Sequence, residues 1–256
     1  MTQLSYALVT GASRGLGKYF ARALAARQNN LVLVARNAGP LAKLAAELEN
    51  AHQIHAETLM LDLASPQAGQ GLAEQLRGRG LKIDLLINNA GFGDQGEFLQ
   101  LPLASQLEMV NLQNATVVEL THKLLPAMIE QRQGGIINVS SMAGFQPIPY
   151  AAIYSATKSF LTTFSLALEA EVHRHGISVV TVCPGRLRAD PDEPGERKKV
   201  PGGEQAHEDV VRDSLDKLDR GGGLVIPGAA NKFAAFAERF VPRGKVARLV
   251  AKMSRK

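Results

Sequence analysis

Short apolar runs alternate with amphipathic stretches along most of the chain. Each run suits a buried strand and is bounded by glycine, proline or polar residues. The strands predicted in this way span residues 5–10, 31–37, 54–61, 83–91, 136–139, 177–185 and 221–228. Between them apolar positions recur at helical spacing, which predicts helices over residues 16–27, 39–50, 66–79, 102–131, 152–175 and 205–220.

This alternation is typical of an α/β fold, in which a parallel sheet of about seven strands carries helices on both faces. No linker or shift in composition divides residues 1–256, so we expect one domain. The segment 186–204 is rich in proline, glycine and charge and follows a strand, which predicts a lid over a site or a passive surface loop.

The first predicted strand runs into the turn TGASRGLG, with glycines at 11, 15 and 17, and a helix follows. Glycines in such a turn let the backbone approach a pyrophosphate, and the helix N-terminus offers free N–H groups and a positive dipole end. A tight packing turn is the alternative, although the position after the first strand favours a nucleotide site.

The end of the second strand indicates which nicotinamide cofactor fits. A carboxylate at that place would bind the ribose of NAD, but this chain has Ala35 and then Arg36, and Arg14 lies within the glycine turn. Two guanidinium groups without an acid favour a 2′-phosphate, hence NADP(H). Two simply solvated arginines are the alternative.

Polar residues also follow the third and fourth strands. Asp62 either accepts a hydrogen bond from an adenine amino group or caps the next helix. Asn88 and Asn89 end an apolar strand, where amides tie neighbouring strands together or border a cofactor along with Ala90 and Gly91. Both interpretations are open for each of these residues.

The stretch from 134 to 158 carries the candidate chemistry. Ser141 follows a predicted strand, and Tyr154 and Lys158 lie four residues apart on the next helix, on one face about one turn from each other. A free tyrosine has a pKa near ~10, so we expect the lysine ammonium to lower the pKa of Tyr154 and make its proton transferable. Ser141 would donate to a substrate oxygen on which charge develops.

Two further residues have competing interpretations. Asn111 lies in an apolar helical stretch with a break expected before it, and it either shares a water with a neighbouring lysine or is a buried helix-bending amide. Cys183 is the single cysteine, and we interpret it as an inert buried thiol rather than a nucleophile. The six histidines form no metal-ligand spacing, so no metal site is expected.

The formal charge of +5 is concentrated at the end of the chain. Residues 232–256 hold eight lysines or arginines and one glutamate, a net of +7, which leaves −2 for the remainder and argues against nucleic-acid binding. Residues 229–256, which we call the C-terminal tail, combine this charge with Phe233, Phe236 and Phe240 at helical spacing. Packing on the protein itself or on a sister subunit is favoured over contact with an anionic membrane.

The composition also indicates where in the cell the protein is expected. The apolar fraction is 45%, and no apolar run approaches the ~20 residues of a spanning helix. The chain begins MTQLSYALVTGAS, without a charged region or cleavage site, so we expect it to be neither exported nor inserted in a membrane. One cysteine fits a reducing, cytoplasmic location.

Taken jointly and in order, these motifs resemble the short-chain dehydrogenase/reductase family over roughly residues 4–228. The matching pieces are TGASRGLG, NNAG at 88–91, Asn111, the serine pair 140–141, YSATK at 154–158 and PG at 184–185. The resemblance implies a doubly wound Rossmann-type domain and hydride transfer between NADP(H) and a carbonyl or alcohol. It also implies a homodimer or homotetramer paired through the helices at 104–131 and 154–175.

The resemblance assigns roles residue by residue. Tyr154 is the acid/base, Lys158 lowers its pKa and holds the nicotinamide ribose, Ser141 orients the substrate oxygen, and Asn111 supports a water relay. The implied cofactor-binding residues, besides Tyr154 and Lys158, are Gly11, Ser13, Arg14, Gly15, Leu16, Gly17, Arg36, Asp62, Leu63, Asn89, Ala90, Gly91, Pro184, Gly185 and Leu187.

One position departs from the family pattern. Many relatives carry a threonine five residues after the proline of the Pro-Gly pair, where it contacts the nicotinamide carboxamide, and Ala189 stands there in this chain. The nicotinamide end is then held less firmly, or by another group such as Arg186 or Arg188. A protein that binds NADP(H) without turnover, as a sensor or scaffold, is therefore the rival to an oxidoreductase.

Overall fold

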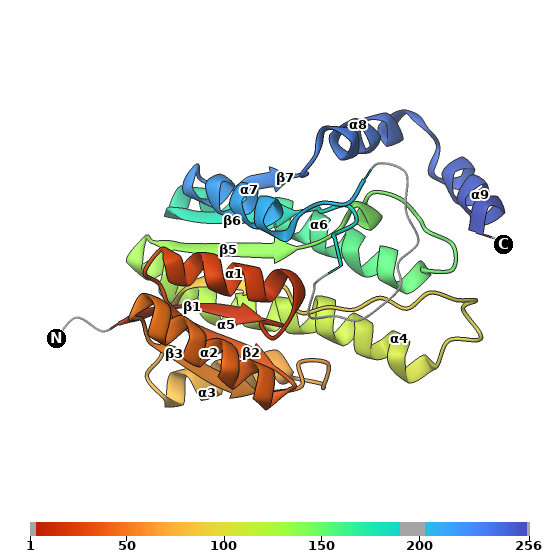
Figure 1. Ribbon diagram of the computed structural model, residues 1–256. Coiled ribbons are helices and arrows are strands. Elements are labelled where there is room, and N and C mark those ends of the chain that lie inside the picture. Colours follow the sequence, from red (N-terminus) through yellow and green to blue (C-terminus); the bar gives the residue numbers. More distant parts are fainter. Residues whose placement is uncertain (1–3, 190–202, 255–256) are drawn as a thin grey trace.

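The computed structural model describes residues 4–189 and 203–254, except for the side chains of residues 239, 253 and 254. In this part, all strands are parallel and form one seven-stranded sheet in the order β3-β2-β1-β4-β5-β6-β7 (Figure 1). The strands are β1 Ser5–Thr10, β2 Asn30–Ala35, β3 Ala56–Met60, β4 Lys82–Asn88, β5 Gly134–Val139, β6 Ile177–Val182 and β7 Gly223–Val225.

Helices cover both faces of the sheet, which confirms the predicted three-layer Rossmann-type fold. One apolar core joins the sheet to α1 (Gly15–Ala26), α2 (Ala38–His52) and α7 (His207–Asp219). The other joins it to α3 (Ala68–Gly78), α5 (Thr116–Gln131) and α6 (Ala152–Val172). Because both faces are covered, central strands such as β1 are continuous apolar runs rather than alternating ones.

The long helix predicted over 102–131 is continuous but irregular. It begins as α4 (Leu103–Val110), passes through the π-helical segment η1 (Asn111–Ala115) and continues as α5. At the break expected before Asn111, the helical hydrogen bonding therefore changes locally and the helix does not end. Such single π turns are common beside functional sites.

Several predicted elements are longer than the observed ones. The strand predicted over 177–185 ends at Val182, because Pro184 has no N–H to continue the ladder. The strand predicted over 31–37 ends at Ala35, so Arg36 lies in the loop beyond it. Residues 190–202 of the predicted lid lie outside the described part of the chain. The described residues on either side of this segment meet in a bridge between Leu187 and Gln205.

The remaining elements are short or peripheral. Two 3₁₀ turns, η2 (Met142–Gly144) and η3 (His173–His175), lie before and after α6. The C-terminal tail folds into α8 (Ala229–Ala237), η4 (Glu238–Phe240) and α9 (Arg243–Ser254), which extend beyond the layered body in Figure 1. No described helix is long and apolar enough to cross a membrane.

Candidate active site

The predicted site residues lie at one edge of the sheet. In a parallel sheet the carboxyl ends of all strands meet at the same edge, and ligands bind where the strand order reverses. Here β1 stands between β2 and β4, so the reversal lies between β1 and β4. Gly11, Arg36 and Asn89 follow the three strands around this point, and Ser141 and Pro184 follow β5 and β6.

The glycine turn after β1 is shaped by close packing on one side and open space on the other. A Cβ atom on Gly17 would lie 2.2 Å from the Gly11 carbonyl oxygen, so only glycine fits there. Gly15 has a φ of +51°, and a Cβ there would meet no atom of the other described residues within 4 Å. The turn is therefore packed against the protein at Gly17 and has room beside it at Gly15.

The N-terminus of α1 suits an anion. Arg14 is its N-cap residue and makes no side-chain cap, and the first turn holds no acidic residue. Ser13 and Arg14 stand in the turn, the Leu16 side chain is buried, and Arg36 is exposed beyond β2. A positive helix end with nearby arginines and an open glycine is the donor set that a dinucleotide pyrophosphate and phosphate require. These residues fit the predicted cofactor.

Amides at the end of β4 hold the turn in place. Asn89 donates from Nδ2 to the carbonyl oxygens of Thr10 (3.0 Å) and Gly11 (3.3 Å). The Thr10 hydroxyl donates to the Ile87 carbonyl and accepts from the N–H groups of Asn89 and Ala90. The amide of Asn89 thus positions the glycine turn, and Thr10, which the sequence analysis did not single out, joins β1 to β4.

Asn88 points away from this edge into the sheet and helix layers. Its Nδ2 donates to Asn138 Oδ1 at 2.8 Å, and Asn138 donates to Ser165 of α6 at 2.8 Å. Of the two interpretations of Asn88, tying strands together is therefore the one that its contacts support.

Asp62 and Leu63 follow β3. The Asp62 carboxylate accepts from the Ala64 N–H at 3.0 Å, so it closes the turn directly after the strand. It does not cap α3, which begins six residues later at Ala68. The Leu63 side chain is buried, and its carbonyl accepts from Thr116, so only its N–H is left to face a ligand.

Ser141 and Tyr154 are brought together by the end of β5 and the start of α6. Ser141 accepts from the Ala143 N–H at 3.1 Å, which fixes its side chain at the start of η2. The Ser141 side chain also faces the Tyr154 phenol closely enough to lower its pKa. Gly93 packs on the tyrosine ring, because a Cβ there would lie 2.8 Å from Tyr154 Cδ2. Gly93 carries no sequence signal for this contact.

Lys158 lies one helical turn further on and is buried. Its Nζ donates to the Val139 carbonyl at 2.9 Å and lies 5.8 Å from the centre of the Tyr154 ring. Burial lowers the pKa of Lys158 from 10.5 to about 8, an effect that Cys183 partly opposes. Cys183 is itself a buried thiol whose pKa is raised by burial, as expected for an inert core cysteine.

The prediction of a lowered pKa for Tyr154 is wrong. Burial raises the pKa of the tyrosine, and the Ser141 side chain opposes that rise only in part. The physical reason is that desolvation disfavours the charged phenolate, while the ammonium lies on the ring side at 5.8 Å and its own pKa is lowered.

The π-helical segment η1 braces both sides of this group. Asn111 is half-buried at its start, and no described contact joins it to Lys158, so the water relay stays a prediction. Gln113 donates to the Phe92 carbonyl at 2.9 Å and packs on Gly91. Asn114 donates to the Thr157 carbonyl of α6 at 3.0 Å. Gln113 therefore holds the loop that carries Gly93, and Asn114 holds the helix that carries Tyr154.

The Pro-Gly pair after β6 is held by its backbone. The Pro184 carbonyl accepts from the Met142 N–H, and the Gly185 N–H donates to Gln205 at 2.8 Å. Leu187 forms the bridge to Gln205 and packs partly against the core. Ala189 is exposed where the described residues end.

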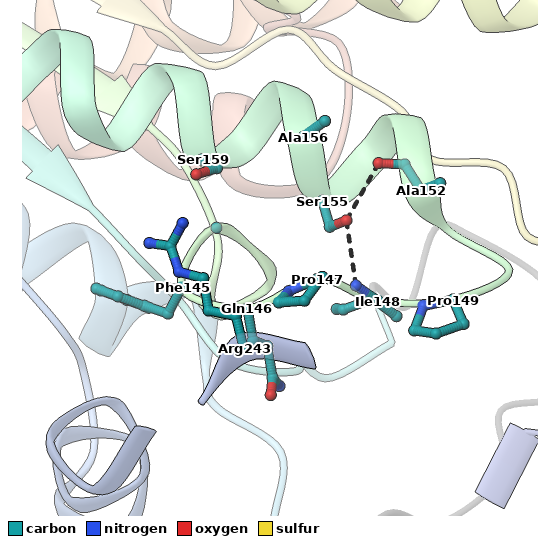
Figure 2. Close-up of a pocket in the computed structure, with 11 residues that line it drawn as sticks. Phe145, Gln146, Pro147, Ile148, Pro149, Ala152, Ser155, Ala156, Ser159 and Arg243 are labelled. Carbon is teal, nitrogen blue, oxygen red and sulfur yellow. Dashed lines mark hydrogen bonds between the residues drawn. The ribbon is translucent and has the colours of Figure 1, made fainter. Parts of the chain in front are cut away.

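A cavity of about 410 Å³ lies on another side of α6 (Figure 2). Its helix residues, Ala152, Ser155, Ala156 and Ser159, recur at helical spacing on a different face from Tyr154 and Lys158. Ser155 accepts from the Ile148 N–H and donates to the Ala152 carbonyl, which fixes the loop over the cavity. This space therefore lies beside the reacting groups rather than around them.

A glycine turn at the reversal of a parallel sheet, with Ser141 after β5 and Tyr154 and Lys158 on α6, is typical of dinucleotide-binding α/β proteins. Residues 5–199 match the family model for short chain dehydrogenases. The chain belongs to that family, as predicted.

Known relatives and structures agree. The chain is 33% identical over 183 residues to the very-long-chain 3-oxoacyl-CoA reductase of Homo sapiens, an alignment that covers 70% of this chain and 58% of that protein. The chain spans roughly half to two thirds of the length of the curated relatives it matches.

Two solved structures match nearly the whole chain. One is a short-chain dehydrogenase from Sphingobium yanoikuyae in complex with NADPH, with a TM-score of 0.79 and 30% identity, covering 92% of this chain and 93% of that one. The other is the bulky-bulky ketone specific alcohol dehydrogenase from Comamonas testosteroni, with a TM-score of 0.79 and 30% identity, covering 93% and 92%. These matches support a dehydrogenase or reductase.

Proposed function

We propose that the protein is an NADP(H)-dependent oxidoreductase that transfers a hydride between nicotinamide C4 and a carbonyl or secondary alcohol. The observation that carries this proposal is the convergence of Ser141, Tyr154 and Lys158 at the sheet edge that also holds the open glycine turn. The relative that reduces 3-oxoacyl-CoA and the neighbour specific for bulky ketones support a carbonyl substrate.

The residues around the reversal point would hold the cofactor. The N-terminus of α1 and the open side of Gly15 suit the pyrophosphate, and Arg14 and Arg36 suit the 2′-phosphate. When bound, NADPH would supply the hydride for carbonyl reduction or NADP⁺ would accept it from an alcohol.

Tyr154 is the proton donor and acceptor in this proposal. Because burial raises the pKa of its phenol, the tyrosine keeps its proton at neutral pH and can donate it to the oxygen of a carbonyl that is being reduced. Ser141, whose side chain acts on the phenol, would orient the same oxygen. Lys158, anchored on the Val139 carbonyl, would stabilise the phenolate that remains after proton transfer.

Turnover distinguishes this proposal from a sensor that binds without reacting. NADPH oxidation is followed with the full chain against 3-oxoacyl thioesters, 3-oxo esters, bulky ketones, steroids and aldehydes. The oxidoreductase proposal predicts carbonyl-dependent oxidation with at least one class. NADPH binding with no oxidation across the panel would support the rival, for which the exposed Ala189 is the only structural argument.

Preference for the phosphorylated cofactor is tested at Arg36. Arg36→Asp should weaken NADPH binding by about 10- to 100-fold, since it removes a charged hydrogen bond and adds repulsion, and should leave NADH binding nearly unchanged. Cofactor binding is measured by fluorescence titration. Arg77→Asp, an exposed arginine on α3, is the matched control and should change neither. An equal loss for both cofactors would overturn the assignment of Arg36.

A further inference from the structure

The C-terminal tail presents an aromatic face that is exposed among the residues that the structure describes. Phe233, Phe236 and Phe240 recur at helical spacing and are 72%, 55% and 73% exposed, and the last two rings lie 5.2 Å apart in an edge-on arrangement. We call these three residues the phenylalanine stripe. Single exposed apolar side chains are ordinary, but three large rings along one face indicate a contact surface.

The opposite face of the same helix is attached to the body. Ala235 is buried, and Asn231 donates to the Pro227 carbonyl at 3.0 Å and packs on Gly185. These two residues lie about half a helical turn away from the stripe. The orientation of α8 is therefore fixed by its inner face, and the stripe points outward. The expectation that the tail packs on its own domain holds for the inner face only.

The tail that carries the stripe is also strongly basic. The tail carries a net of +7, whereas the rest of the chain carries −2. In the described part of the tail, five basic side chains are exposed, and none forms an ion pair with a described residue: Lys232, Arg243, Lys245, Arg248 and Lys252. The one acid of the tail, Glu238, is half-buried, and burial raises its pKa.

An exposed apolar stripe on a basic segment matches the surface of an anionic bilayer. Aromatic rings enter the boundary between headgroups and acyl chains, while lysine and arginine meet the lipid phosphates. A second copy of the tail would bring two surfaces of net +7 together, which charge repulsion opposes. We propose that the C-terminal tail docks this protein on the surface of an anionic phospholipid membrane, without crossing it.

The tail also borders the loop between Ser141 and Tyr154. Ala235, Glu238 and Arg243 line a cavity of about 380 Å³ together with Phe145 and Pro147 of that loop. Docking would therefore bring the loop next to the site close to the membrane surface.

Vesicle binding tests the proposal with the full chain. Flotation is compared on vesicles of phosphatidylcholine alone and of phosphatidylcholine mixed with phosphatidylglycerol. We expect binding to the anionic vesicles only, weakened by added salt. Phe233→Ser with Phe240→Ser removes the two most exposed rings, and Lys245→Glu with Arg248→Glu reverses two charges. Each pair should weaken binding on the order of tenfold or more.

Two exposed apolar side chains outside the tail provide the matched control. Met60→Ser with Leu99→Ser changes two side chains that are 68% and 92% exposed elsewhere on the protein, and this pair should bind vesicles like the wild type. Circular dichroism checks the fold of every variant. Absence of vesicle binding, equal binding to neutral vesicles, or full binding by both tail variants would overturn the proposal. A tail variant that loses self-association in sedimentation velocity, with no vesicle binding by the wild type, would assign the stripe to a contact between copies instead.

Discussion

Burial shifts the pKa values of Tyr154 and Lys158 in opposite directions, but it favours the neutral form of both side chains. A phenol is neutral with its proton and an amine is neutral without it, so desolvation raises the pKa of the tyrosine and lowers that of the lysine to about 8. The sequence predicted that the two groups meet. It did not predict the sign of the tyrosine shift, because that sign depends on how much surrounding chain excludes water.

Gly93 packs closely on the tyrosine ring, and we predict that Gly93→Ala displaces Tyr154. The added methyl would lie 2.8 Å from Tyr154 Cδ2, so the ring and the loop that carries Gly93 must move apart. We expect kcat for carbonyl reduction to fall by about tenfold or more, since small misplacements of reacting groups are costly, with NADPH affinity little changed. Gly39→Ala, where a methyl meets open space, is the matched control and should retain activity. Wild-type kcat in Gly93→Ala would contradict this contact.

Lys158 makes stability depend on pH. Between about pH 8 and 10.5 the unfolded chain holds the lysine proton and the folded chain has released it, so the free energy of unfolding rises with pH in that window. Below pH 8 both states are protonated, and the cost of burying the charge is fully present.

We predict that Lys158→Met abolishes this rise, which amounts to about 3 kcal/mol for the stated pKa change. Urea unfolding of the wild type and the variant across the window measures it. The comparison removes the opposite contribution of Tyr154, whose raised pKa is common to both proteins. A constant difference between the two proteins at every pH would show that the lysine is not shifted.

At the scale of elements, a buried polar row crosses the middle of the sheet. Asn88 of β4 and Asn138 of β5 stand side by side in register and are hydrogen-bonded, and Asn138 also reaches Ser165 of α6. The row lies just behind the strand ends that carry Asn89 and Ser141. It therefore fixes the spacing of β4, β5 and α6, the three elements that position the candidate catalytic group.

Replacing the central amide should destabilise the fold. Asn138→Leu leaves the buried Asn88 Nδ2 without its acceptor and removes the donor to the Ser165 hydroxyl, which keeps its bond to the Leu161 carbonyl. We expect a loss of roughly 2–3 kcal/mol in the free energy of unfolding. Urea denaturation at neutral pH measures the loss. Asn50→Leu, at an exposed position of α2, should change stability by less than about 0.5 kcal/mol. Unchanged stability in Asn138→Leu would mean that the row does not hold the elements together.

Element types were predictable because buried parallel strands are continuous apolar runs and the covering helices are amphipathic. Element ends were less predictable, since Pro184 ends β6 earlier and Arg36 lies beyond β2. The π-helical segment could not be predicted from the sequence, because a local change in the spacing of helical hydrogen bonds requires no particular residue type. Yet it directs Gln113 and Asn114 toward the two walls of the site.

At the scale of the whole molecule, residues far apart in sequence meet at one edge of the sheet. Motif order predicted which residues gather there. The contacts of Thr10 and Gly93 could not be predicted, because they depend on the path of the loop after β4. The aromatic face of the tail could be read as a stripe, but its outward direction follows only from the attachment of Asn231 and Ala235.

In the proposed reaction, the Tyr154 phenol transfers the proton that accompanies hydride transfer. The measurement is single-turnover oxidation of bound NADPH by a carbonyl substrate of the wild type, compared with Tyr154→Phe. Tyr6→Phe, a buried tyrosine of β1, serves as the control. The account predicts a loss of about 10²-fold or more in the rate for Tyr154→Phe, with NADPH binding retained and the control unaffected. A wild-type rate in Tyr154→Phe would contradict it.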